Sequence, residues 1–307
     1  MNSAPTGITP SKDVFHLASL VRVRTWHALW RSIKPSFRFL LQTEVHVFSF
    51  AVAANILISF FPFLMAMVLL CRSVLHWQAA VDVILKTLND YFPDGFGLSF
   101  RRYLTDPKWL PKFSWLSVVL LLFAANAIFT PLEVALNRIW RVKENRSLLR
   151  NQVISLGLIF ACGALVLASI CLTTINVQFL TSKFGTGRLS AVLQIIAFKV
   201  TAVPITMLMI FLIFWLLPNT KIPIKRIIPA AAGVALLLEL SKWINIVTWP
   251  YLHAKLLQEV PPFIQSISII LWSFIGTLIL FAGAEWSARV IVEEMEDKSE
   301  PAEIQLN

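Results

Sequence analysis

Six long apolar runs divide the chain, and each is long enough to cross a lipid bilayer as one helix. A helix rises about 1.5 Å per residue and the hydrocarbon core is roughly 30 Å thick, so a span needs about 20 apolar residues. We therefore predict an all-α polytopic membrane protein with six transmembrane helices. The runs cover residues 47–70, 114–134, 153–177, 191–217, 227–247 and 266–290.

Composition agrees with this class and predicts the domain organisation. Hydrophobic residues make up 57% of the chain and charged residues 14%, whereas soluble domains are usually about one-quarter charged. We predict a basic N-terminal segment over 1–46, a six-helix membrane domain over 47–290, and an acidic disordered tail over 291–307. The first span of the membrane domain should act as an uncleaved signal anchor. The net charge of +10 needs no nucleic acid, because Lys and Arg concentrate in cytoplasmic loops.

The basic residues predict the orientation. The segment before the first span and the loops after the second and fourth spans are rich in Lys and Arg, and the loops after the third and fifth are poor. The positive-inside rule then places both termini in the cytoplasm of a bacterial inner (plasma) membrane. The first loop, about 71–113, is the exception, since it carries both signs of charge on the outer side.

Two stretches outside the spans have the pattern of amphipathic helices. We expect the first, over 77–92, to lie on the outer leaflet or to pack over the bundle. The second, over 26–41, should lie on the cytoplasmic face, with Pro35 bending or interrupting it. The apolar positions are Trp77, Val81, Ile84, Leu85, Leu88, Tyr91 and Phe92 in the first, and Trp26, Leu29, Trp30, Ile33 and Phe37 in the second.

Ionisable residues inside spans are costly and therefore informative. Glu239 and Lys242 share one face of the fifth span because they are three residues apart. Lys199 enters the fourth span from the outside to a similar depth. Two interpretations stay open: a polar pathway for head groups, ions or protons, and a structural pair that neutralises itself.

The first span has small residues and a proline. Asn55 and Ser59 are one turn apart on one face, and Pro62 frees a backbone carbonyl in the middle of the membrane. This pattern fits either a kinked gating helix or ordinary close helix packing, and we favour packing. Asn126 is a further polar position, in the second span.

The inner end of the second span carries a polar strip that we interpret as interfacial and structural. Glu133 and Asn137 are four residues apart and face together. Arg138 and Trp140 have the pattern of an interfacial anchor, with the indole at head-group depth. Glu285, at the end of the sixth span, should stabilise the inner basic loops by pairing with them.

No pattern for catalysis, a metal or another cofactor is found in the sequence. The five histidines are scattered, the three cysteines lie in or beside apolar runs, and neither a P-loop nor a GxSxG elbow occurs. We therefore predict that the protein is not an enzyme.

Short motifs give a resemblance to a known family. The chain resembles the YihY/virulence factor BrkB family of bacterial inner-membrane proteins, which was formerly mislabelled ribonuclease BN. The resemblance covers roughly residues 30–290 and implies a six-helix membrane protein connected with envelope lipids. It rests on Ser59-Phe-Phe-Pro62, Asn137-Arg-Ile-Trp140, Leu217-Pro218, Ala232-Gly233 and Gly283-Ala284-Glu285.

Our first hypothesis is the movement or handling of envelope lipids, or of another amphipathic anion, without an ATPase. Basic groups would engage the head-group phosphate in a groove between the first, fourth and fifth spans. The alternative is a non-transporting scaffold for envelope proteins. A ribonuclease would need converging metal ligands, and none is present. Membrane lipids are the expected partners, nucleic acid is not, and the sequence leaves homo-oligomerisation open. The pathway candidates are Asn55, Ser59, Pro62, Asn126, Lys199, Glu239 and Lys242.

Overall fold

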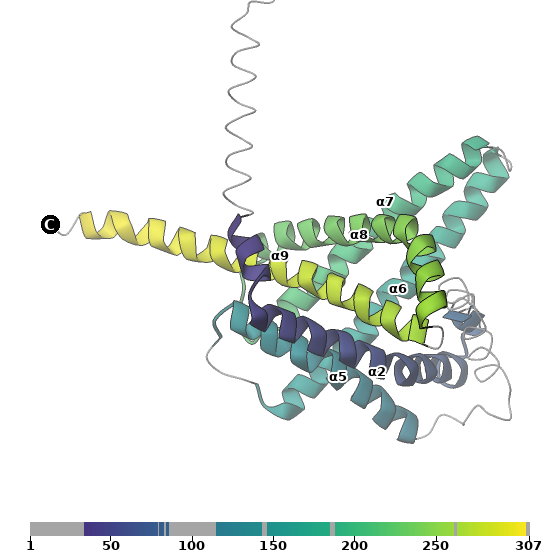
Figure 1. Cartoon of the computed structure of the whole chain (residues 1–307), viewed down its shortest axis with the longest axis horizontal. Coiled ribbons are helices and arrows are strands. Elements are labelled where there is room, and N and C mark those ends of the chain that lie inside the picture. The colour runs from purple at the N-terminus through teal and green to yellow at the C-terminus, as the bar shows by residue number, and fades with distance from the viewer. Residues whose placement is uncertain are drawn as a thin grey trace, which may run out of the picture.

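Long helices make up the part of the chain that the structure describes. The computed structural model describes residues 34–78, 80–82, 84–85, 115–142, 146–184, 188–260 and 263–304, and no strand occurs in these ranges. The all-α prediction is therefore confirmed for these residues. The helices, shown in Figure 1, are α2 (Thr43–Ser73), α5 (Trp115–Ile139), α6 (Leu148–Phe184), α7 (Arg188–Leu216), α8 (Ile224–Glu259) and α9 (Ile264–Ile304).

Four helical stretches within the described residues are long and apolar enough to cross a membrane. A shorter apolar stretch, Ala202–Leu216, lies in α7. Each predicted apolar run coincides with one of the long helices, although the helices extend beyond the runs. Four spans are thus supported by length and composition, and six remains a prediction. The four stretches are Thr43–Ser73, Leu149–Ser169, Ile224–Glu259 and Ile264–Arg289.

The helices form a closed ring in chain order. Each long helix packs against the next, and α9 closes the ring by packing against both α2 and α8. Figure 1 shows α9 running between α2 and α8. Lipid tails are as apolar as leucine, so helix association in a bilayer depends on close packing rather than on removal from water. The largest fully buried side chains in the core include Phe214, Phe281, Leu136, Leu158 and Ile227.

The contact between α8 and α9 is close because of one glycine. A Cβ atom at Gly283 would lie 2.1 Å from Cγ2 of Val234 and 3.7 Å from the carbonyl oxygen of Ala230. Gly233, on the neighbouring turn of α8, has no such neighbour within 4 Å. Small residues let helix backbones approach one another. Gly283 therefore sets the spacing between α8 and α9.

Helix α8 is longer than a bilayer is thick. Its 36 residues would extend about 54 Å as a straight helix. Figure 1 shows α8 turning sharply near its C-terminal end, before α9 begins. Pro250 lies in this part of the helix, and a proline removes one backbone donor from the hydrogen-bond ladder.

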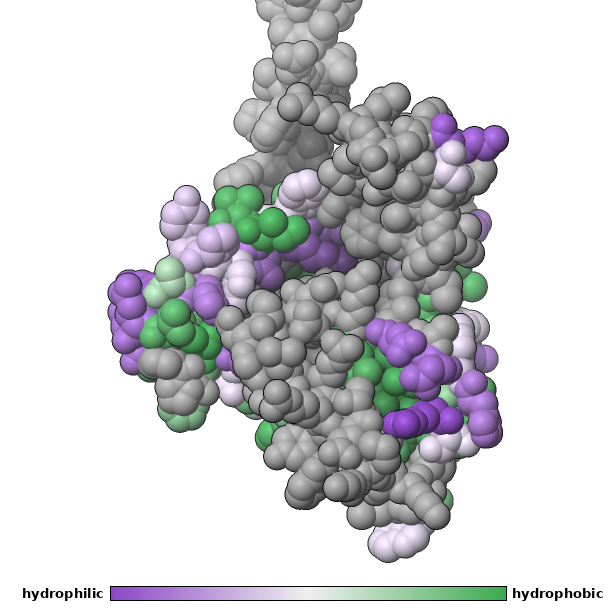
Figure 2. Space-filling model, turned by 90° about the vertical axis from the view of Figure 1, so that its right-hand side faces the viewer, coloured by the Kyte–Doolittle hydropathy of each residue, from purple (hydrophilic) through white to green (hydrophobic). Residues whose placement is uncertain are grey.

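The predicted outer helix packs on the bundle rather than lying free. Val81 and Leu85 are buried in one cluster with Val68 and Cys71 of α2. Trp77, predicted for the same stripe, is 41% exposed because it lies in the turn before the helical residues begin. Figure 2 views this end of the molecule and shows hydrophilic side chains beside hydrophobic ones. Residues 86–92 lie outside the described residues.

The N-terminal amphipathic stretch, predicted over 26–41, differs in detail from its prediction. Residues 34–40 are helical and include Pro35, and the chain turns at Leu41 and Gln42 instead. Phe37, predicted on the apolar face, is 60% exposed. Its neighbours Phe39 and Leu40 pack against the core in its place. Residues 26–33 lie outside the described residues.

The predicted acidic tail over 291–307 was expected to begin with a helical continuation of the sixth span. The backbone of α9 is helical through Ile304, and the disorder predicted for the tail stays a prediction. The tail is rich in glutamate, which has a high intrinsic helix propensity and can therefore extend the preceding helix.

Gly283→Ala should destabilise the fold, because the added methyl group would overlap Val234, whose branched side chain is stiff in a helix. We expect a loss of about 1–3 kcal/mol, as is usual for overpacking. The matched control Gly233→Ala should be neutral or stabilising by up to about 1 kcal/mol. Thermal unfolding in detergent, followed by circular dichroism, measures both. Combining Gly283→Ala with Val234→Ala should restore stability, and equal stability of the two glycine variants would contradict the packing.

Candidate functional site: an arginine-lined pocket at one end of the bundle

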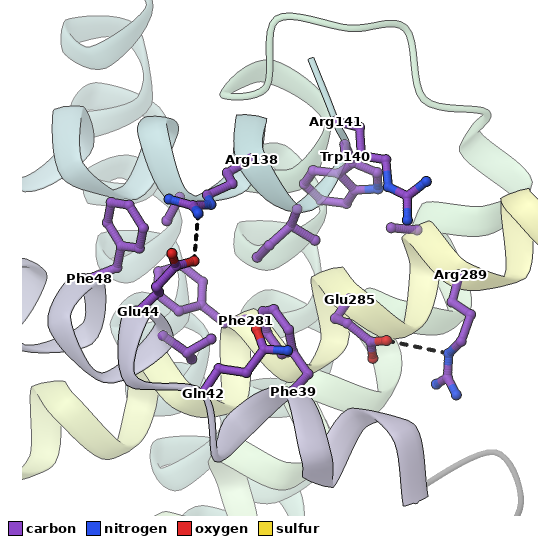
Figure 3. A pocket seen from close by; sticks show the side chains of 14 residues that line it. Phe39, Gln42, Glu44, Phe48, Arg138, Trp140, Arg141, Phe281, Glu285 and Arg289 are labelled. Carbon is purple, nitrogen blue, oxygen red and sulfur yellow. Dashed lines mark ion pairs between the residues drawn. The ribbon is translucent and has the colours of Figure 1, made fainter. Parts of the chain in front are cut away.

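A cavity of about 680 Å³ lies at the end of the bundle where α2 begins and α5 ends. The third wall is α9, and the helical segment 34–40 borders it (Figure 3). Aromatic side chains and three arginines face this space, so its lining combines apolar surface with positive charge. The lining residues are Phe39, Gln42, Glu44, Val45, Phe48, Ala135, Arg138, Ile139, Trp140, Arg141, Phe281, Glu285, Ala288 and Arg289.

One ion pair joins the two helix ends at the pocket. Arg138 NH2 lies 2.6 Å from Glu44 Oε2, and both side chains are more than half exposed. Glu44 is in the first turn of α2 and Arg138 in the last turn of α5, where each charge opposes the helix dipole. The Arg138 guanidinium also lies 6.0 Å from the centre of the Phe48 ring. An exposed pair of this kind contributes about 0–1 kcal/mol, so its main effect is to orient the guanidinium.

A second group of contacts fastens the segment 34–40 to α9. Ser36 Oγ donates to Glu285 Oε2 at 2.6 Å and accepts from Arg289 NH2 at 3.0 Å. Arg289 Nε lies 3.4 Å from Glu285 Oε1, as Figure 3 shows. We predicted that Glu285 would pair with the inner basic loops. It pairs instead with an arginine four residues along its own helix, where the i,i+4 spacing brings the two side chains together.

Trp140 is partly buried and packs against α7, and its predicted role as an interfacial anchor stays a prediction. Its ring lies edge-to-face on Phe214 of α7, with ring centres 5.5 Å apart. Its Nε1 is buried and has no hydrogen-bond partner among the described residues. Buried indole N–H groups usually find a partner, so this donor is an unsatisfied polar group beside the pocket.

Behind the pocket, a polar network joins two loops at the same end of the bundle. The guanidinium of Arg146 donates to the carbonyl oxygens of Leu216, Leu217 and Pro218 at 2.9, 3.1 and 2.7 Å. The last carbonyls of a helix have no partner within the helix, so Arg146 caps the end of α7. Arg146 Nε also donates to Asn219 Oδ1 at 3.0 Å.

The predicted polar strip of the second span belongs to this network. Asn137 is buried, and its Oδ1 accepts from the backbone N–H of Asn219 at 2.8 Å. Glu133 is also buried, and its carboxylate bonds the side chains of Asn151 and Asn137 and attracts Arg146. Burial lowers the pKa of the Arg146 guanidinium, and the Glu133 carboxylate partly offsets this. These contacts join the strip to Asn151, Arg146 and Asn219, and helical spacing alone does not reveal them.

The predicted charge pair of the fifth span is present in α8. Lys242 Nζ lies 2.5 Å from Glu239 Oε1, which also accepts from Thr206 Oγ1 of α7 at 3.3 Å. Only 8% of the Glu239 side chain is exposed, against 54% of the Lys242 side chain. The backbone of Lys199 is in α7, and its side chain lies outside the described residues.

The remaining pathway candidates do not gather around this pair. Asn55 is half-buried and Ser59 is buried in α2, which continues without a break through Pro62. Asn126 is exposed on α5 and accepts from Thr130 Oγ1 at 3.3 Å. Helix α9 packs between α2 and α8, and the groove expected between the first, fourth and fifth spans stays a prediction. Helical spacing predicts the face of a residue, but not which helix lies opposite.

The described ranges hold no group of three His, Cys, Asp or Glu side chains that could hold a metal ion. Cys71 and Cys162 are free thiols.

The comparisons with known proteins agree with this architecture. The family model described as virulence factor BrkB matches residues 36–305. The chain belongs to this family. The match begins at Ser36 and includes every residue that lines the pocket of this BrkB-family protein.

Three relatives are described as UPF0761 membrane proteins. The one from Acinetobacter baylyi is 29% identical over 74% of this chain and 54% of its own length. Those from Pseudoalteromonas translucida and Alcanivorax borkumensis are each 26% identical, over 61% and 69% of this chain and 59% and 49% of their own lengths. The chain thus spans about half the length of the curated relatives it matches. No solved structure matches it.

Arg146→Ala should destabilise the protein by about 3 kcal/mol, since it leaves the end of α7 uncapped and Glu133 buried without its opposite charge. The matched control is Arg150→Ala, an exposed arginine in the first turn of α6, which should change stability by less than about 0.5 kcal/mol. Chemical unfolding in detergent, followed by tryptophan fluorescence, compares the two. A similar loss in both variants would contradict the capping role of Arg146.

Proposed function

We propose that this integral membrane protein binds the head group of a lipid, or of another amphipathic anion, in the arginine-lined pocket and moves or handles it without its own ATPase. The observation that carries the proposal is the pocket itself. Arginine donors stand there beside aromatic walls, at one end of an apolar helix bundle. Guanidinium groups match phosphate geometry, and apolar walls suit the adjoining part of an amphiphile.

We also propose six spans in a bacterial inner membrane, with both termini cytoplasmic. The distribution of basic residues supports this orientation. The pocket end carries most of the described basic residues of the loops, and the opposite end carries few. Cytoplasmic loops are enriched in Lys and Arg, so the pocket end should be cytoplasmic. The basic residues at the pocket end are Lys34, Arg38, Arg138, Arg141, Arg146, Arg150, Lys221, Lys225, Arg226 and Arg289.

The surface next to the pocket supports an amphipathic rather than a small soluble ligand. Val47 and Phe50, one turn beyond Glu44 on α2, are 60% and 54% exposed. Their side chains offer apolar contact beside the charged lining. An acyl chain could lie along this part of α2 while its head group occupies the pocket.

Movement across the bilayer would need a second polar step, and the Glu239–Lys242 pair is our candidate. A buried carboxylate and a more exposed ammonium on α8 would give a head group exchangeable partners inside the membrane.

A non-transporting scaffold is the second candidate. Three large apolar residues at the end of α2, Val74, Leu75 and Trp77, are 50%, 54% and 41% exposed. Exposed apolar patches often mark protein contacts. Polar replacement of these three residues should abolish envelope-partner binding if the scaffold is the function, and leave lipid binding intact.

Ala288→Phe should weaken the binding of anionic lipid at least tenfold, about 1.4 kcal/mol, because the ring would fill the pocket without changing its charge. Leu240→Phe, on a 55% exposed position of α8, is the matched control and should bind as the wild type does. Native mass spectrometry of protein titrated with phosphatidylglycerol in detergent gives the occupancy. Equal occupancy in all three proteins would refute the pocket as the lipid site.

Glu239→Gln and Lys242→Ala should each slow phospholipid movement about tenfold in reconstituted liposomes, because each removes one charge of the intramembrane pair. Dithionite bleaching of a fluorescent phospholipid gives the rate. Lys255→Ala, at the exposed end of α8, serves as the control. Unchanged rates in both pair variants would show that lipid does not pass this pair.

A further inference from the structure

Arg141 has an unusual backbone conformation at the pocket. Its φ angle is +53°, in the left-handed region that L-residues other than glycine rarely adopt. It follows the last turn of α5, and the backbone N–H of Val142 donates to the carbonyl oxygen of Asn137 at 2.8 Å. This is the six-to-one bond of a Schellman cap, in which the left-handed position is usually glycine. An arginine here is less stable than a glycine would be.

The charges of the pocket single out the same residue. Arg138 is paired with Glu44, and Arg289 is paired with Glu285. Arg141 also lines the pocket and is exposed, and no carboxylate partner for it is found among the described residues. In Figure 3 its side chain extends from the end of α5 toward α9, beside Trp140. The lining therefore has one positive charge in excess.

Resting on the function proposed above, we propose that Arg141 is the head-group receptor of the pocket and that its ligand is a singly charged phosphodiester of a phospholipid. The single excess charge matches a phosphodiester better than a doubly charged phosphate monoester. The guanidinium supplies paired donors to two phosphate oxygens. The buried Nε1 of Trp140 is a further donor beside it.

The carboxylates of Glu44 and Glu285 restrict the class of lipid head group further. Glu44 and Glu285 line the same cavity, and each carboxylate has more acceptor positions than its ion pair uses. A head group with hydroxyl or ammonium donors can bond them, whereas a fatty-acid carboxylate has no donor to offer them. Phosphatidylglycerol and phosphatidylethanolamine share the required chemistry: a phosphodiester with donors beyond it. Phosphatidylcholine lacks the donors, and oleate lacks both features.

The test distinguishes the effect of the Arg141 backbone conformation on stability from the effect of its charge on lipid binding. Arg141→Gly should raise the Tm of the lipid-free protein by about 2 °C, since it removes the left-handed strain, and lower phosphatidylglycerol occupancy at least tenfold. Arg141→Asn, which also tolerates this conformation, should show the same loss of binding. Arg141→Lys retains a charge and should lose only a few-fold. Arg150→Ala is the control for a lost surface arginine and should bind as the wild type does.

Native mass spectrometry measures the occupancy of each variant by phosphatidylglycerol, phosphatidylethanolamine, phosphatidylcholine and oleate. Preference for either of the first two lipids, lost in the Gly and Asn variants, supports the proposal. Wild-type occupancy in the Gly variant, a fall in its Tm, or an equal preference for oleate overturns it. If the Gly variant binds normally but Ala288→Phe does not, the pocket remains a lipid site without Arg141. If Ala288→Phe also binds normally, the proposed function fails with it.

Discussion

The position of α9 between α2 and α8 is the constraint on which the rest of the structure depends. Without this helix the ring would be open, and the pocket would lack the wall that carries Glu285 and Arg289. The position requires close contact with α8, and Gly283 provides it by leaving room for the side chain of Val234. In a bilayer, where water does not drive helices together, such steric fit carries much of the energy of association. The shape of one residue therefore determines whether the charged site can form.

The polar groups at the pocket end form two sets of contacts with different structural roles. The inner set, around Arg146, satisfies helix-end carbonyls and a buried carboxylate, and so holds the loops in place. The outer set consists of two ion pairs at the pocket wall. The inner set fixes the end of α5, which carries Arg138, and the weak ion pairs of the outer set orient the guanidinium groups. This arrangement suits recognition of a ligand whose charge must compete with those pairs.

Hydropathy predicted the helices well, because the length and composition of an apolar run decide whether it becomes a long helix. The three-residue spacing of Glu239 and Lys242 predicted their contact, because this contact depends only on spacing along one helix. The pocket could not be predicted in the same way. Ser36 and Arg289 are 253 residues apart, and only the closure of the ring brings them together. The structural interpretation of Arg138, Trp140 and Glu285 gave no sign of a shared cavity. The i,i+4 spacing of Glu285 and Arg289 is visible in the sequence and could have predicted their ion pair. The φ angle of Arg141 could not be predicted from the sequence.

Because α8 is long, the thickness of the bilayer should affect how this helix is placed in the membrane. A straight helix of this length would extend well past a hydrocarbon core of roughly 30 Å on at least one side. The turn near its C-terminal end shortens the reach of the helix (Figure 1), and Trp249 and Tyr251 in the C-terminal third of α8 are residue types that favour the membrane interface. A thinner or thicker bilayer would change the tilt of α8. Since α8 contacts α9 at Gly283, such a change would reach the wall of the pocket through the helix that closes the ring.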